Sequence, residues 1–337
     1  MTPIIFVWLG KSLPKFSLQS LLFAKKSNPR REVCFCLDNE PSVQARAFLE
    51  KSGVKLLVLG KVKNIDASGL DPEKLQFRGD LWVNTSLRFF YLKYLCRLLG
   101  LVKFFHAELD NAVFNLDGLD EKLDQCGHGL FVPRDASDRA LASLIYCNRA
   151  ESLSELIGLY SRATPPKHDM DALGMYSREY SNHFFSLSTE SYAENREFWR
   201  MLEPAFLGGL FDAAAIGQYT LGVDPIHRKG RPSYNGFINE NSKINWGGAV
   251  FDADGKNLFL SSSAKAADKY RLFNLHIHAK NWSAFDSLLG NGRILKRLQE
   301  GKRSIISGRI FVFFGWAYAP LLRVKGAAKK LLRYSNY

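Results

Sequence analysis

The chain has 337 residues, of which 46% are hydrophobic and 23% are charged, a composition that is typical of a globular protein and excludes intrinsic disorder. Its formal net charge of +13 indicates an anionic partner: a nucleic acid, an anionic lipid or a phosphate-bearing substrate. The five cysteines lack paired metal-binding spacings, which argues against a zinc site, and the absence of helix-turn-helix, RNP-type and zinc-finger patterns disfavours nucleic acid.

The first third of the chain alternates between strand and helix patterns. We expect strands at residues 4–9, 32–37, 54–59 and 102–109, with helices at 17–26, 42–52 and 84–99. Such alternation builds a mostly parallel sheet that binds ligands at the carboxyl ends of its strands. The predicted fold class is therefore α/β, a mostly parallel twisted sheet flanked by helices. Neither a dinucleotide-binding nor a P-loop glycine motif is present, which disfavours both of those enzyme classes.

Beyond residue 126 the patterns are less regular. We expect a strand at 129–133, helices at 137–148, 152–161 and 213–221, a long surface loop at 163–179, and irregular β structure at 226–270. No apolar run reaches the roughly 18 residues that a membrane-spanning helix needs. The sequence therefore predicts a cytoplasmic protein.

Residues 291–337 form a basic, aromatic-rich tail of amphipathic character. Basic residues that flank an apolar aromatic segment are typical of an interfacial anchor on an anionic leaflet. A terminal helix that packs on the core, with its charges in solvent, has the same pattern. If the tail is an interfacial anchor, the protein is peripheral at the inner face of the membrane; if the tail is a packed terminal helix, the tail gives no reason to place the protein there.

Two acidic residues, Glu108 and Asp110, interrupt the apolar strand expected at 102–109. Residues at i and i+2 of a strand share a face, so both carboxylates can converge on one point. Mn²⁺ and Mg²⁺ prefer oxygen ligands and leave positions for water and substrate phosphates. The pair therefore predicts a metal site for a diphosphate, and the alternative is a strand end whose two acids face solvent.

A second group of polar side chains follows late in the chain, where His276, His278 and Lys280 alternate at strand spacing. A neutral imidazole can complete an octahedral site, and a neighbouring lysine suits a phosphate. The alternative for a single histidine is an ordinary hydrogen-bonded core residue.

The strand-helix alternation, the acid-x-acid triplet after the fourth strand and the late His-x-Lys element together resemble the GT-A nucleotide-sugar glycosyltransferases, over residues 1–285. The resemblance implies a catalytic domain at 1–290, with a nucleotide-binding half (1–125) and an acceptor half (126–290). It also implies that Mn²⁺ or Mg²⁺ sits on the donor diphosphate. Asp110 is then the firmest ligand, and His278 is preferred to His276 as the third. Because many members have Asp-x-Asp where this chain has Glu-Leu-Asp, Glu108 is expected to act directly or through water.

The same resemblance nominates residues that hold the donor. They are Val7, Trp8, Gly10, Lys11, Asp38, Arg88, Glu108 and Lys280. Arginine suits a phosphate because its planar guanidinium donates two parallel hydrogen bonds. Asp38 is equally well explained as a turn or cap acid.

For catalysis, an inverting transfer needs a carboxylate base near the acceptor hydroxyl. Asp212, after two glycines, is the first candidate and Asp224 the second; the alternative for Asp212 is a cap of the following helix. Asn239, Glu240 and Trp246 lie in a polar segment that suits an acceptor sugar.

The function predicted from the sequence is a metal-dependent transfer of a sugar from a nucleotide-sugar, a UDP-sugar above all, to a cell-surface polysaccharide or lipid-linked acceptor. Two alternatives stay open. One is a sugar-1-phosphate nucleotidyltransferase, although the segment after the first strand is a poor copy of its glycine-rich basic motif. The other is a non-catalytic scaffold of the same fold at a membrane surface.

Overall fold

A computed structural model describes residues 1–10, 12–60, 65–67, 69–73, 75, 80–190, 201–222, 250–254, 256–261 and 269–291. Several of the predicted features lie outside these residues. They are Lys11, Asp224, Asn239, Glu240, Trp246 and the tail beyond residue 291.

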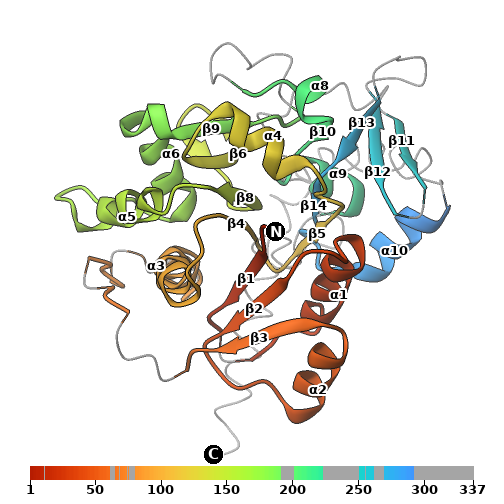
Figure 1. The fold of residues 1–337 in the computed structure, drawn as a ribbon, viewed down its shortest axis with the longest axis horizontal. Coiled ribbons are helices and arrows are strands. Elements are labelled where there is room, and N and C mark those ends of the chain that lie inside the picture. Colours follow the sequence, from red (N-terminus) through yellow and green to blue (C-terminus); the bar gives the residue numbers. More distant parts are fainter. Residues whose placement is uncertain are drawn as a thin grey trace, which may run out of the picture.

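A parallel four-stranded unit forms the first half of the main sheet. Its strands are β1 (Ile4–Trp8), β2 (Val33–Leu37), β3 (Val54–Val58) and β4 (Phe104–Ala107). They lie in the order β3-β2-β1-β4, and every neighbouring pair is parallel. Helices α1 (Ser17–Ser27) and α2 (Val43–Lys51) lie on one side of this unit, and α3 (Leu81–Leu99) lies on the other (Figure 1). The predicted α/β class and the first seven predicted elements are confirmed.

Beyond β4 the sheet continues with mixed pairing. The strands are β8 (Leu144–Cys147), β6 (Leu130–Ala136), β7 (Arg139–Ala140) and β9 (Phe184–Leu187). β8 is antiparallel to both β4 and β6, whereas β9 runs parallel to β6. The helix predicted at 137–148 is therefore wrong, because this segment contains β7 and β8: both pair with the preceding strand β6, and β8 also pairs with the more distant β4.

Helices and short 3₁₀ turns cover this second half of the sheet. They are α4 (Leu119–Cys126), α5 (Glu151–Gly158), η1 (Leu159–Ser161), α6 (Asp169–Glu179) and η2 (Ser181–His183). The surface loop predicted at 163–179 is wrong for most of its length, since α6 occupies it. His168 begins that helix, and its Nδ1 accepts a hydrogen bond from the Asp171 amide at 3.0 Å.

Two smaller sheets complete the described fold. β5 (Asn111–Val113) pairs antiparallel with β14 (Asn274–His276). A second group of strands has the order β10-β13-β12-β11: β10 (Gly209–Leu210), β13 (Lys269–Leu272), β12 (Leu258–Ser261) and β11 (Val250–Ala253). Helices α8 (Pro204–Leu207), α9 (Ala215–Leu221) and α10 (Trp282–Asn291) lie near them in Figure 1.

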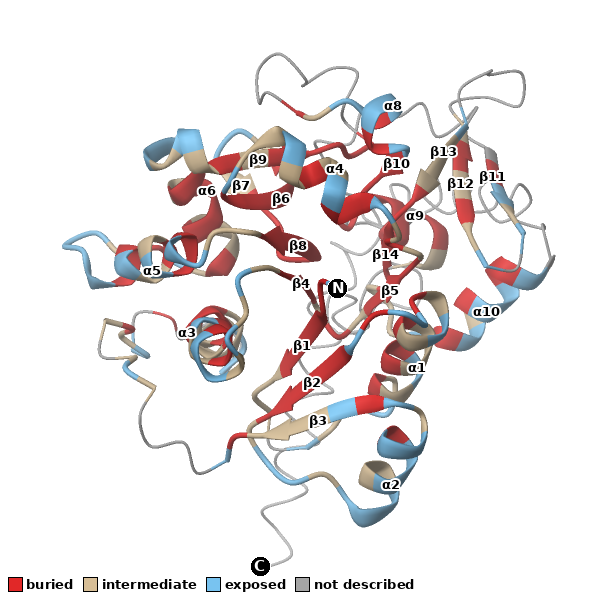
Figure 2. Cartoon of the chain, in the orientation of Figure 1, coloured by how far each residue is buried: buried red, intermediate tan, exposed pale blue. Residues whose placement is uncertain are grey.

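The two faces of the parallel strands bury two separate hydrophobic clusters. Ile5 and Val7 pack toward α3, whereas Ile4 and Phe6 pack toward α1. This alternation follows from the period of two in a strand that is covered on both faces. Figure 2 shows β1 and β2 almost entirely buried, whereas the edge strand β3 is partly exposed. Among the described residues, no helix has the length and apolarity needed to cross a membrane.

Candidate metal and diphosphate site

Glu108 and Asp110 lie just past the carboxyl end of β4, in the turn that leads to β5. The Asn111 amide donates to the Glu108 carbonyl at 3.0 Å and closes this turn. The two acids are therefore brought together by a turn and not by the strand spacing on which their convergence was predicted. In the sheet, β2 and then β3 lie on one side of β1, and β4 lies on the other side of β1. The acids thus stand where the strand order reverses, which is where open α/β sheets bind their ligands.

The antiparallel pairing of β5 with β14 brings a histidine to these acids. His276 pairs with Asn111, and its Nε2 lies 3.0 Å from Asp110 Oδ2. One ligand atom each from Glu108, Asp110 and His276 lies within 4.8 Å of the others. His276 therefore joins the acids, whereas the preferred candidate His278 is not part of this group; its ring centre lies 5.5 Å from that of His276.

Lys280 contributes a cation to the same group, because its Nζ donates to Asp110 Oδ2. The backbone of Lys280 is left-handed (φ 57°), and its amide donates to the Ile277 carbonyl at 2.8 Å. This tight turn directs the Lys280 side chain toward Asp110. Burial alone would raise the pKa of the Asp110 carboxyl, but His276 and Lys280 outweigh burial and hold that pKa well below its usual range. Asp110 is thus a partly buried carboxylate held between the His276 imidazole and the Lys280 ammonium group.

Arg88 lies beside the site, but both arms of its guanidinium bind protein carboxylates. Nη1 donates to Glu108 Oε1 at 2.8 Å, and Nη2 donates to Asp169 at the start of α6. The arginine and Asp169 side chains are only 7% and 4% exposed. The predicted direct contact of Arg88 with a donor does not fit these bonds, which instead fix Glu108 against α6.

Asp212 is fully buried and does not reach solvent. Its Oδ1 accepts from the Ile216 amide, and its Oδ2 accepts from the Gly217 and His276 amides, each at 2.9 Å. Burial raises the pKa of Asp212 to about 6. The structure thus assigns this carboxylate the capping role that the sequence left open, and it also holds the backbone of His276. Because both of its oxygens already accept hydrogen bonds from backbone amides, Asp212 does not fit the predicted role of the base that deprotonates the acceptor.

Three of the predicted donor residues lie at the carboxyl ends of β1 and β2. Trp8 and Asp38 are partly buried, and Tyr91 donates to Asp38 Oδ1 at 3.4 Å. A Cβ on Gly10 would lie 2.6 Å from the Trp8 ring, so the indole packs over this glycine. Val7, in contrast, is 8% exposed and points into the core.

Sequence reasoning missed two residues that support the site. Asn274 donates from its Nδ2 to Asn111 Oδ1 at 2.8 Å and to the Asp212 carbonyl at 3.1 Å. Asp169 fell within the predicted surface loop. The His-Asp-Met-Asp stretch at 168–171 does contain a helix-start signal, which could have identified Asp169 as the first residue of a helix. Nothing in the local sequence of Asn274 indicates its partners, Asp212 and Asn111, which lie 62 and 163 positions away.

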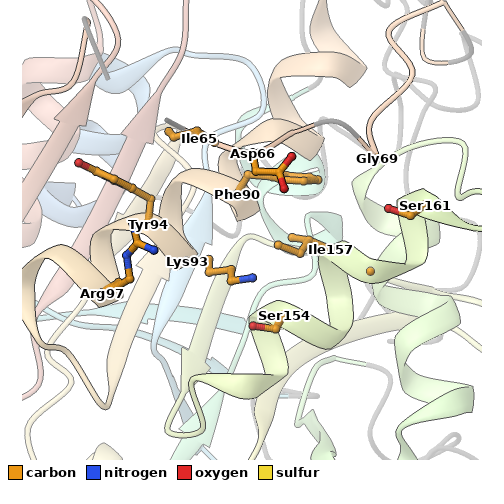
Figure 3. Close-up of a pocket in the computed structure, with 11 residues that line it drawn as sticks. Ile65, Asp66, Gly69, Phe90, Lys93, Tyr94, Arg97, Ser154, Ile157 and Ser161 are labelled. Atoms are coloured by element: carbon orange, nitrogen blue, oxygen red, sulfur yellow. The ribbon is translucent and has the colours of Figure 1, made fainter. Parts of the chain in front are cut away.

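A separate cavity of about 470 Å³ lies between α3, α5 and residues 65–69. Phe90, Lys93, Tyr94 and Arg97 line it from α3, and Ser154 and Ile157 line it from α5 (Figure 3). It shares no lining residue with the group around Asp110. Lys93 therefore lines this cavity.

No family model matches the chain, and no curated protein matches its sequence. Among solved structures, it is similar to apo mouse xyloside xylosyltransferase 1, with a TM-score of 0.40 and 12% identity, over 60% of this chain and 94% of that one. It is also similar to the glycosyltransferase GlyE of Streptococcus pneumoniae TIGR4 (TM-score 0.37, 16% identity, 59% of this chain and 50% of that one). A cytidylyltransferase from Leptospira borgpetersenii matches with a TM-score of 0.35 and 14% identity, over 55% and 74% of the two chains. These TM-scores are all below 0.5, so the function below is argued from the residues of this chain.

Proposed function

We propose that the chain is a metal-dependent glycosyltransferase that moves a sugar from a nucleotide-sugar, in the first place a UDP-sugar, to a cell-surface polysaccharide or a lipid-linked acceptor. The observation that supports this best is the meeting of Glu108, Asp110 and His276, with ligand atoms within 4.8 Å, past the end of β4. That position is where an α/β sheet binds its ligand. A cation in the same group, Lys280, adds a partner for phosphate.

The donor set fits Mn²⁺ or Mg²⁺. Two carboxylates and one imidazole supply oxygen and nitrogen ligands, and they leave coordination positions for water and phosphate oxygens. When bound, the ion would neutralise charge that develops on the leaving diphosphate. The protein groups have their own tasks: Lys280 would donate to a phosphate oxygen, Arg88 holds Glu108, and Asp212 holds the His276 backbone.

The nucleoside would lie along the ends of the two neighbouring strands. Trp8 ends β1, Gly10 and Asp38 follow β1 and β2, and all three lie at the same edge of the sheet as Asp110. An indole can stack on a base, and a carboxylate can accept from ribose hydroxyls. We place the donor over residues of the 1–125 half and the acceptor over the 126–290 half. In this proposal the protein is cytoplasmic, and the basic tail beyond residue 291 holds it at the inner face of the membrane, next to its acceptor.

The test is to incubate the protein with a panel of nucleotide-sugars, with and without Mn²⁺, and to measure release of the nucleoside diphosphate. We expect Mn²⁺-dependent release from at least one UDP-sugar. Asp110→Asn should abolish it and weaken the binding of Mn²⁺ and UDP at least tenfold in calorimetry, because the ligand loses its charge. The matched control Asp286→Asn changes an exposed residue of α10 and should change neither.

Two results would contradict the proposal. One is that no donor is consumed with any divalent metal. The other is that Asp110→Asn binds Mn²⁺ and UDP as tightly as the wild type. Formation of a nucleotide-sugar from UTP and a sugar-1-phosphate would favour the nucleotidyltransferase alternative instead.

A further inference from the structure

A second buried carboxylate, Glu190, lies next to the residues that support the candidate metal site. Thr189 forms a parallel bridge with Phe211, and the Phe211 amide donates to the Ser188 carbonyl at 2.7 Å. Residue 190 therefore stands alongside residue 212 in the paired segments. The Thr189 hydroxyl also donates to the Arg134 carbonyl at 3.2 Å, which fixes this segment against β6.

Three hydrogen bonds connect this position to the metal-ligand candidates, one toward His276 and two in series toward Glu108. The Asp212 carboxylate accepts from the His276 amide at 2.9 Å. The Asp212 carbonyl accepts from the Ser143 hydroxyl at 2.9 Å, and the Ser143 carbonyl in turn accepts from the Glu108 amide at 3.3 Å. Glu190 thus lies next to Asp212, which is hydrogen-bonded directly to the His276 backbone and, through Ser143, to the Glu108 backbone.

Glu190 is 6% exposed, and neither of its carboxylate oxygens makes a hydrogen bond of ordinary geometry with the described residues; its own amide and the Ala213 amide are its nearest donors. Burial, followed by the nearby Asp212 and Asp135, raises its pKa well above the usual range. Its acidic neighbours are themselves satisfied: Asp212 accepts three backbone N–H groups, and Asp135 pairs with Arg139. Among the described residues of this group, Glu190 is the one whose carboxylate has only poorly aligned amide donors in place of such bonds.

An unpaired buried carboxylate destabilises a fold, and a glutamine or an apolar residue of similar size would pack there at lower cost. Such groups in native proteins call for an explanation, and they are expected at functional sites, where a ligand can complete their hydrogen bonds. The sugar hydroxyls of a glycosyl transfer are suitable partners, because each offers a donor to a carboxylate oxygen. Asp212, the other carboxylate near the site, is already occupied by amides.

We propose that Glu190 is the catalytic base that binds the hydroxyl of the acceptor and takes its proton. This inference rests on the proposed function. In the step, the acceptor oxygen forms a bond to the anomeric carbon, and its proton passes to the Glu190 carboxylate. The bond from the anomeric carbon to the diphosphate breaks, and the nucleoside diphosphate leaves with that electron pair. When water is the acceptor, the same step hydrolyses the donor, so the base can be tested without knowing the natural acceptor.

The experiment compares the wild type, Glu190→Gln, and the control Glu121→Gln, which changes an exposed residue of α4. Glutamine keeps the shape but cannot take a proton. For Glu190→Gln we expect the turnover of Mn²⁺-dependent UDP release from the UDP-sugar panel to fall about 100-fold or more, with the KM for the donor unchanged within twofold. The affinity for UDP with Mn²⁺ should also be unchanged.

A second readout does not depend on turnover. Removing an unpaired buried acid should raise the melting temperature of the ligand-free protein by about 2–4 °C, while Glu121→Gln should melt with the wild type. Undiminished UDP release by Glu190→Gln would overturn the assignment, and so would a lowered melting temperature, since that would mean that the carboxylate is bonded within the protein. A wild type that consumes no donor would refute the proposed function itself, which is a distinguishable result.

Discussion

Gly217 in α9 is the most sensitive packing position next to the candidate site. A Cβ at this position would lie 1.8 Å from the His276 carbonyl oxygen and 3.0 Å from Asp212 Oδ2. Because non-bonded carbon and oxygen atoms stay about 3.3 Å apart, Gly217→Ala would push α9 and β14 apart by about 1.5 Å. The obstacle is backbone, so a side-chain rotation cannot relieve it.

The size of the effect follows from two opposing terms. Overpacking a core costs about 1–3 kcal/mol, and this clash is at the upper end, whereas alanine gains about 1 kcal/mol over glycine in a helix. We therefore expect Gly217→Ala to lower the free energy of unfolding by about 2 kcal/mol. Because the displaced residue is His276, the affinity for Mn²⁺ and UDP should fall about tenfold or more.

The assay is urea unfolding followed by calorimetry with Mn²⁺ and UDP. The matched control is Gly158→Ala at the end of α5, where an added Cβ meets no heavy atom within 4 Å. This control should be neutral or more stable by up to about 1 kcal/mol. Should Gly217→Ala unfold at the same urea concentration as Gly158→Ala and bind Mn²⁺ equally well, the close packing of α9 on β14 would be refuted.

Two further predictions concern buried ion pairs. Asp120→Asn should lower the free energy of unfolding by about 3–5 kcal/mol at pH 7, because it unpairs the buried Arg31, and urea unfolding measures this loss. Burial alone would raise the pKa of Asp120, but the bonds from Arg31 outweigh it and hold this pKa below its usual range, so the stabilisation by Asp120 is present above about pH 4 and is lost on acidification. The difference in unfolding free energy between the wild type and Asp120→Asn should therefore be smaller at about pH 3 than at about pH 7. The same difference at both pH values would contradict this. Arg88→Lys leaves either Glu108 or Asp169 without its partner, because a lysine lacks the second arm of the guanidinium, and we expect the affinity for Mn²⁺ to fall about tenfold. The control is Arg97→Lys, which changes an exposed residue of α3. Equal affinities of the two variants would show that Arg88 does not hold Glu108.

The parallel half of the sheet could be predicted because its signals are local. Each strand there is a short apolar run between turn residues, and each helix has a start or stop signal nearby. The strands within 137–148 could not be predicted, since Ala140, Leu141 and Ala142 favour a helix when taken alone. The pairing of β8 with β4 and β6 overrides that propensity, and no local pattern contains it.

The acidic half of the site was predictable, and the choice between the histidines was not. Strand parity places His276 and His278 on one face, but β14 ends at His276 and the chain then turns. The roles of Arg88 and Asp212 depend on their partners: Asp169 in one case and the amides of α9 and β14 in the other. Those partners come from elements that the sequence pattern could not position in space.

The pairing of β5 with β14 has a consequence for how the site comes into being. Asp110 and His276 are separated by 166 residues, so their contact closes one of the long loops of the fold. Contacts of such range form slowly, because the chain entropy of a large loop is lost before the contact stabilises anything. At synthesis rates of roughly 5–20 residues per second, the carboxylates leave the ribosome roughly 10–30 s before their histidine. A truncated chain that stops before β14 would keep the Arg88 partner of Glu108 but would lack both His276 and Lys280, the partners of Asp110.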